Sequence, residues 1–86
     1  MLTTTARLRG ASAGSARIVE LNFSDGSSRQ VDVGPLLWGP VFAEIAESDE
    51  AFAALFFDEE LGTVCWPNGA DIAPETLLSL PNLGPA

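Results

Sequence analysis

The topology of the chain depends first on the stretch RIVELNFSDGSSRQVDV, residues 17–33. Its two halves alternate apolar and polar residues, which is the pattern of half-buried strands. A two-residue turn at Asp25-Gly26 would put polar residues of the second half on the apolar face of the first. A three-residue loop instead pairs Val19 with Val31 and keeps the apolar side chains together, provided that Gly26 adopts a left-handed conformation. We therefore predict an antiparallel hairpin with a three-residue loop.

The segments on either side of this hairpin predict a further strand and two short helices. Residues 3–8 are rich in β-branched side chains and are expected to form a strand, and the small residues 10–15 are expected to form a loop. Gly39-Pro40 is expected to begin one helix, because proline suits the first helical position. Ser48 is a favourable N-cap for the second helix, whose Phe52 is expected to face the core.

The last third of the chain predicts a second hairpin and a final helix. Residues 55–57 and 63–66 are expected to be its strands, and residues 67–69 (Pro-Asn-Gly) a tight turn. Pro74 is expected to begin the helix and Pro81 to end it. The sequence therefore predicts an α+β fold with an N-terminal antiparallel hairpin, two short helices, a second hairpin and a short C-terminal helix. We expect one domain over residues 1–86, with flexible ends at residues 1–4 and 81–86.

The charge of the chain limits its partners. Twelve carboxylates oppose four arginines and no lysine, which gives a net charge of −8, and no basic residue follows Arg29. Direct binding of nucleic acid or of an anionic membrane surface needs basic side chains, so neither is expected. No apolar run approaches the roughly 20 residues of a membrane span. A single cysteine suits a reducing cytoplasm. The expected partner is a protein with a basic surface.

The residue types that are missing argue against catalysis. The chain has no histidine and no tyrosine, so no Ser-His or Cys-His nucleophile can form. Cys65 would have to act without a base, and we interpret it as a buried structural thiol. We expect no catalytic residue, no cofactor and no small-molecule substrate.

A cluster of carboxylates is the one candidate for a metal site. Asp58-Glu59-Glu60, together with Asp71, could gather a hard cation such as Mg²⁺. The spacing is not that of a calcium-binding loop, and adjacent acids at a hairpin tip are usually solvated. We therefore expect no metal, and a carboxylate-metal hydrolase remains a remote alternative.

The two tryptophans are candidates either for the core or for an interface. Core packing is the default for Trp38 and Trp66, because the indole ring buries a large area. The alternative is an anchor in a protein interface, a role in which tryptophan is enriched. Trp66 is the better candidate for an anchor, because it borders the Pro67-Asn68-Gly69 turn and the acidic hairpin.

Two motifs carry a family resemblance. The run LGTVCWPNGAD at residues 61–71, supported by VGPLLWGPVF at residues 33–42, resembles the bacterial domain-of-unknown-function family 2442, whose signature is close to L-G-T-V-x-W-P-N-G-A-D. The resemblance implies a small α+β protein. It also implies, for members that stand alone, one half of a two-gene module in the manner of an antitoxin beside a toxin. The family offers no established catalytic residues to carry over.

These observations lead to two hypotheses about function. The first is a non-enzymatic acidic binding module, antitoxin-like or regulatory, that masks a basic surface of a protein partner. The second is a DNA-mimic inhibitor of the anti-restriction or anti-CRISPR type, which requires the acids that follow Gln30 to converge on one face. The candidate partner-binding residues are the acids of the helices and of the second hairpin, with two residues of the signature: Glu44, Glu47, Asp49, Glu50, Asp58, Glu59, Glu60, Trp66, Asn68 and Asp71.

Overall fold

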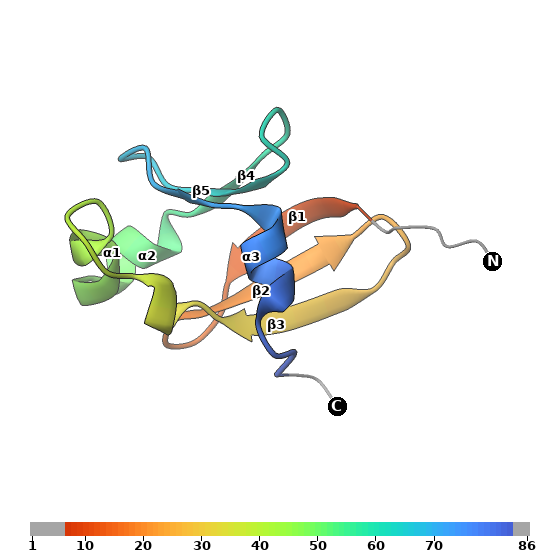
Figure 1. Ribbon diagram of the computed structural model, residues 1–86, viewed down its shortest axis with the longest axis horizontal. Helices are drawn as coiled ribbons and strands as arrows, with labels where there is room; N and C mark the ends of the chain where they lie inside the picture. The colour runs from red at the N-terminus through yellow and green to blue at the C-terminus, as the bar shows by residue number, and fades with distance from the viewer. Residues whose placement is uncertain (1–6, 84–86) are drawn as a thin grey trace.

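Two three-stranded antiparallel sheets form the framework of the protein, as the computed structural model shows for residues 7–83 (Figure 1). The predicted α+β class is confirmed. The strand order in each sheet follows the chain. The first sheet contains β1 (Leu8–Ala13), β2 (Ile18–Phe23) and β3 (Ser28–Asp32), and the second contains β4 (Phe56–Asp58), β5 (Thr63–Cys65) and β6 (Asp71–Ile72).

The β2–β3 hairpin has the predicted register. Val19 is opposite Val31, and both side chains are fully buried. The backbone N–H of Gly26 donates to the Phe23 carbonyl at 3.0 Å, and that of Phe23 donates to the Ser27 carbonyl at 3.0 Å, so the loop has three residues. Gly26 has a φ of +88°, as the bulged loop requires.

The first strand lies further along the chain than predicted. Residues 10–13, expected in a loop, pair with β2 through contacts that include Gly10 opposite Asn22 and Ala13 opposite Val19. Their low β-propensity is overridden because β2 offers them unpaired backbone groups. The register shifts between Leu8 and Gly10, where glycine permits an irregular strand. The rest of the expected strand at residues 3–8 lies largely outside the described residues.

The short helices follow the first sheet. A 3-10 turn, η1 (Gly34–Leu36), precedes α1 (Ala43–Glu47) and α2 (Asp49–Ala53). The expected start of α1 at Pro40 is wrong: Gly39 has a φ of +92°, and the backbone N–H of Phe42 donates back to the Gly39 carbonyl, so a turn comes before the helix. The predicted cap of α2 is confirmed, because Ser48 Oγ accepts a hydrogen bond from the Ala51 N–H at 3.1 Å.

The second hairpin and the last helix are also confirmed. β4 and β5 are antiparallel, and α3 (Pro74–Ser79) has its proline in the first turn. The turn at residues 67–69 does more than reverse the chain. The backbone N–H of Trp66 donates to the Ala70 carbonyl at 2.9 Å, so this turn joins β5 to the short strand β6, which the sequence did not predict.

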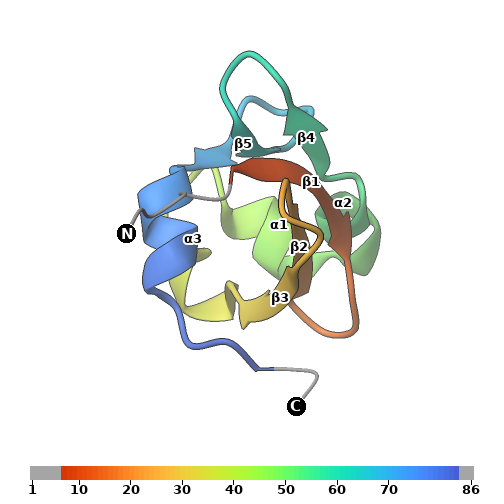
Figure 2. The same cartoon turned by 90° about the vertical axis from the view of Figure 1, so that its right-hand side faces the viewer.

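The core lies between the two sheets and the helices. Figure 1 shows the β4–β5 hairpin beside β1, and Figures 1 and 2 together show α3 in front of the first sheet. The outer edge of β3 is covered by the chain that follows α3, since Gln30 exchanges hydrogen bonds with Asn82 and Leu83. None of the helices between residues 7 and 83 has the length and apolar character of a membrane span. The largest side chains of the core come from every layer: Trp66, Phe52, Leu21, Ile45 and Leu77.

Candidate protein-interaction surface

The predicted partner-binding acids fall into two separate groups. One group lies on and beside α1 and α2, and the other at the turn between β4 and β5, which Figure 1 shows away from those helices. Asp71 belongs to neither group and is exposed on β6. The acids of the helices are Glu44, Glu47, Asp49 and Glu50, and those of the turn are Asp58, Glu59 and Glu60.

Three of these acids are already engaged within the protein, and one of them, Glu44, accepts a hydrogen bond from the Asn68 side chain. Asp58 Oδ1 accepts hydrogen bonds from the backbone N–H groups of Glu60 at 2.8 Å and of Leu61 at 3.1 Å, so this carboxylate shapes the turn. Asp49 forms an ion pair of 2.8 Å with Arg17, although its side chain is 94% exposed. The other acids of the two groups remain exposed to solvent.

Trp66 is a core residue, as the default expectation had it, and its burial argues against its place among the candidate partner-binding residues. Its side chain is 2% exposed, and its indole N–H donates to the Phe52 carbonyl at 3.0 Å. The ring meets Phe42 edge to face, with centroids 6.1 Å apart, and Phe52 at 6.3 Å. A buried indole that finds both aromatic neighbours and an acceptor is satisfied in the fold and presents no face to a partner.

Asn68 joins the turn after β5 to α1. Its side-chain amide donates to the Val41 carbonyl at 3.0 Å and to Glu44 Oε1 at 3.2 Å. Its Oδ1 accepts from the Ala70 N–H at 3.0 Å, which closes the turn. Asn68, predicted as a partner contact, therefore holds two loops together and fixes the Glu44 carboxylate beside Val41.

Trp38 is the exposed tryptophan, contrary to the default expectation of core packing. Its side chain is 76% exposed, whereas the preceding residue, Leu37, is buried in the core. Leu37 faces inward at the end of η1, and Gly39, with its positive φ, then reverses the chain, so Trp38 faces solvent. Val41, on the same loop, is 50% exposed.

A hollow of about 310 Å³ lies next to Trp38. Leu36, Trp38 and Phe42 line it, together with Asp71 on β6 and Thr76 on α3. We group this hollow with the exposed Val41 and with Glu44, because Asn68 donates both to the Val41 carbonyl and to the Glu44 carboxylate. We call this candidate interface the Trp38 surface, and it consists of Leu36, Trp38, Val41, Phe42, Glu44 and Asp71.

Cys65 is a buried thiol, as the sequence predicted. Burial raises the pKa of Cys65 above its ordinary value, and the negative charges of Asp58 and Asp71 raise it further. A thiol that resists ionisation is a poor nucleophile. Among residues 7–83, no three side chains of Asp, Glu, Cys or His lie close enough to hold a metal ion, so Asp71 does not join the acids of the β4–β5 turn in such a group.

The sequence contained a signal for the Trp38 surface that composition alone does not reveal. Leu36-Leu37-Trp38 is an apolar run in a loop between two Gly-Pro pairs. Such a loop can turn only some of its apolar side chains toward the core, so one of them is left facing solvent. Which residue faces outward depends on the backbone angles of Leu37 and Gly39, and these cannot be obtained from the order of residues.

The fold and this surface together define a small α+β protein that presents an exposed tryptophan within an acidic surrounding. A family model described as "Protein of unknown function (DUF2442)" matches residues 9–80. The chain belongs to this family, as its two motifs indicated. No curated protein and no solved structure is significantly similar to the chain.

Proposed function

We propose that the chain is a non-enzymatic binding module, antitoxin-like or regulatory, that masks a basic surface of a protein partner. The observation that carries the proposal is Trp38, which is 76% exposed and lines a hollow that Asp71 also lines. Isolated monomers rarely leave so large an apolar side chain in solvent beside other exposed apolar residues.

The Trp38 surface has the arrangement expected of an energetic centre with a charged rim. Tryptophan is among the residues whose truncation costs most in interfaces, commonly about 2 kcal/mol or more. Val41 extends the apolar area, and Asn68 holds Glu44 next to it. Rim carboxylates speed association with a basic partner and exclude acidic ones. This combination favours a protein partner with an apolar site surrounded by Lys and Arg.

The distribution of charge supports a protein partner over mimicry of DNA. A surface of 5262 Å² with twelve carboxylates has about one acid per 440 Å². Duplex DNA has roughly one phosphate per 100 Å², on a cylinder with one charge per ~1.7 Å of axis. The acids that follow Gln30 are also spread over the helices, the β4–β5 turn and the strands β3 and β6, and Arg17 pairs with Asp49.

The test is capture of the partner from the source cell at low ionic strength, with identification by mass, followed by binding kinetics. We expect Trp38→Ala to weaken the affinity about 30-fold or more, mainly through faster dissociation. Phe56→Ala is the matched control, because Phe56 is also an exposed aromatic residue but lies on β4. The proposal fails if Trp38→Ala binds the same partner as tightly as the wild type. Competition by duplex DNA for the same site on the partner would favour the mimic.

A further inference from the structure

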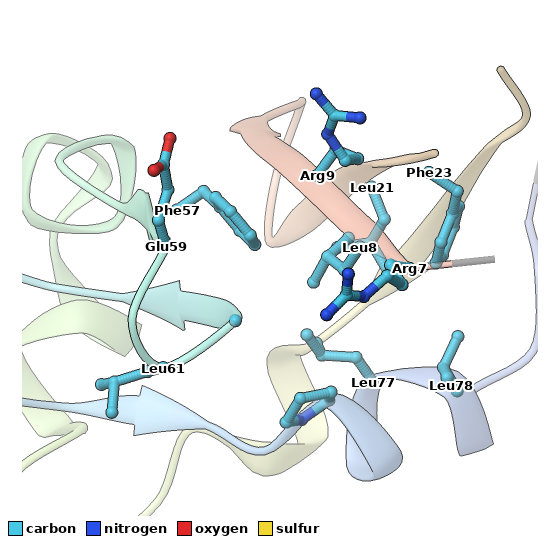
Figure 3. Close-up of a pocket in the computed structure, with 12 residues that line it drawn as sticks. Arg7, Leu8, Arg9, Leu21, Phe23, Phe57, Glu59, Leu61, Leu77 and Leu78 are labelled. Carbon is cyan, nitrogen blue, oxygen red and sulfur yellow. The ribbon is translucent and has the colours of Figure 1, made fainter. Parts of the chain in front are cut away.

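A cleft of about 650 Å³ opens between the two sheets, and none of its lining residues belongs to the Trp38 surface (Figure 3). Strands β1 and β2 form one wall, β4 and the turn after it form another, and α3 closes the third side. Most of the lining residues are apolar. Those that matter here are Leu8, Leu21, Phe57, Leu61, Leu77 and Leu78.

Two arginines, Arg7 and Arg9, also line this cleft. Within residues 7–83, neither guanidinium makes an ion pair or a hydrogen bond. The other two arginines are engaged: Arg17 binds Asp49 and the Ala46 carbonyl, and Arg29 donates to the Leu78 carbonyl. The two uncommitted cations of the described chain therefore lie at the same cleft.

The position of Arg7 is fixed by the first sheet. Its backbone N–H donates to Ser24 Oγ at 3.0 Å, and its carbonyl accepts from the Ser24 N–H at 2.8 Å. Figure 3 shows its guanidinium in the opening between Leu8 and Leu77. Glu59 and Arg9 also line the cleft, but Figure 3 shows the Glu59 carboxylate and the Arg9 guanidinium directed away from that opening. The opening thus has a positive charge above an apolar interior, in a chain whose net charge is −8.

We infer that this cleft binds a small organic anion, with a carboxylate or phosphate group held by Arg7 and an apolar body between the sheets (Figure 3). The guanidinium fork matches both head groups. The volume lies within the range of roughly 300–1,000 Å³ for small-molecule sites. A nucleic acid is a poorer occupant, because the acidic remainder of the surface repels a polyanion. Such a ligand is independent of the protein partner and of the Trp38 surface.

The probe for this site is decanoate, a carboxylate on an alkyl chain, with decyl phosphate as the second head group. Decyltrimethylammonium is the matched control with the opposite charge. Titration of the ¹⁵N-labelled full chain at low ionic strength, below the micelle concentration of each probe, gives affinities and locates the site by amide shifts. We expect both anions to bind at least tenfold more tightly than the cation, with shifts centred on Leu8, Phe57 and Leu77.

Two variants test the assignment by different mechanisms. Arg7→Gln removes the attraction and is expected to weaken decanoate binding about tenfold to a hundredfold. Leu78→Glu places a negative charge on the wall at a half-exposed position and is expected to weaken it similarly. The controls are Arg9→Gln, which removes the same charge from a guanidinium that Figure 3 shows directed away from the opening, and Leu83→Glu, which makes the same charge change as Leu78→Glu outside the lining residues.

Three results would overturn the inference. The first is equal affinity for the anions and the cation. The second is a set of amide shifts centred elsewhere, for example at Trp38. The third is an Arg7→Gln variant that keeps its circular dichroism spectrum and binds decanoate within twofold of the wild type. Retained binding in both control variants, with loss in both cleft variants, would support the site.

Discussion

The indole N–H of Trp66 donates a hydrogen bond of 3.0 Å to the backbone carbonyl of Phe52. This bond connects the residue after β5 to the last turn of α2, across 14 positions of the chain. It also provides the acceptor that a buried indole needs. The Trp-Pro-Asn-Gly part of the motif thus places the Trp66 side chain in the core and joins the Asn68 side chain to the loop before α1.

The first prediction compares the two tryptophans. Trp66→Ala should lower the free energy of unfolding by about 3–5 kcal/mol, because it leaves a large cavity and removes the donor to the Phe52 carbonyl. Trp38→Ala should change it by less than about 0.5 kcal/mol, because Trp38 is exposed. Urea unfolding followed by circular dichroism measures both. A Trp38→Ala variant as unstable as Trp66→Ala would contradict the burial of these residues.

The contrast between these tryptophans marks what the sequence could and could not predict. Both residues lie beside Gly-Pro or Pro-Asn-Gly corners and have the same intrinsic preference for burial. Trp66 follows a strand whose three residues are all buried, whereas Trp38 follows a 3-10 turn with no fully buried residue. The side that each indole faces therefore depends on the path of the backbone in the folded protein. The local sequence pattern around each tryptophan does not predict that path.

The second prediction concerns the β2–β3 loop. Gly26→Val should destabilise the fold by roughly 1–3 kcal/mol through backbone strain alone, because an added Cβ would meet nothing within 4 Å. Gly26→Asn should cost much less, since asparagine tolerates the left-handed region. Asp25→Asn should be mild, as Asp25 is fully exposed and bonds only with Ser27. Thermal unfolding of the three variants tests this, and a Gly26→Val variant that melts like the wild type would exclude the bulged loop.

The sequence predicted the register of the β2–β3 hairpin but not the position of β1. The hairpin of residues 17–33 was predictable to the residue because one face is buried and a slip would expose it. β1 has Gly10, Ser12 and Ala13, whose side chains carry little information about either face. Its place in the sheet comes from pairing with β2. The local sequence at residues 10–13 has no apolar alternation that would predict this pairing.

The third prediction concerns Arg17, which joins the first sheet to the helices. Its guanidinium donates to the Ala46 carbonyl at 2.8 Å, near the C-terminal end of α1, and lies 5.2 Å from the centre of the Phe52 ring. Arg17→Met should destabilise the protein by about 1–2 kcal/mol, because a charged hydrogen bond and a cation–π contact are lost. Asp49→Asn should cost under about 1 kcal/mol, because the ion pair is exposed.

A double-mutant cycle separates the contributions in chemical denaturation. The coupling energy between Arg17→Met and Asp49→Asn should be small compared with the effect of Arg17→Met alone. If Asp49→Asn reproduced the whole effect of Arg17→Met, the ion pair would be the main contact and the carbonyl and ring contacts would be secondary.

The fourth prediction is a dependence on alkaline pH caused by Cys65. Since burial raises the pKa of Cys65 above its ordinary 9.0, the unfolded chain loses the thiol proton at a lower pH than the folded chain. Between these two pKa values only the unfolded chain is stabilised by loss of the thiol proton. The free energy of unfolding should therefore fall as pH rises above about 9, by up to about 1.4 kcal/mol per pH unit. Cys65→Ala should remove this part of the slope. Rapid alkylation of the folded thiol at neutral pH would contradict its burial.

The last prediction asks which carboxylates guide the partner. If the Trp38 surface is the interface, Glu44→Gln with Asp71→Asn should slow association several-fold at low ionic strength and flatten its salt dependence. The amide oxygen that Glu44→Gln introduces can still accept the hydrogen bond from Asn68, so the loop should keep its structure.

Glu59→Gln with Glu60→Gln removes the same number of charges from the β4–β5 turn, which Figure 1 shows away from this surface. At physiological salt, where charges are screened beyond ~8 Å, its effect should be under about twofold and smaller than that of the Glu44 and Asp71 pair in the same buffer. Stopped-flow or surface-based kinetics against the captured partner measures both pairs. Equal effects would mean that net charge alone steers the encounter. Association that is insensitive to salt in every variant would leave the acids without a role in binding, and the interface would then have to be sought on the arginine-bearing strands β1 to β3.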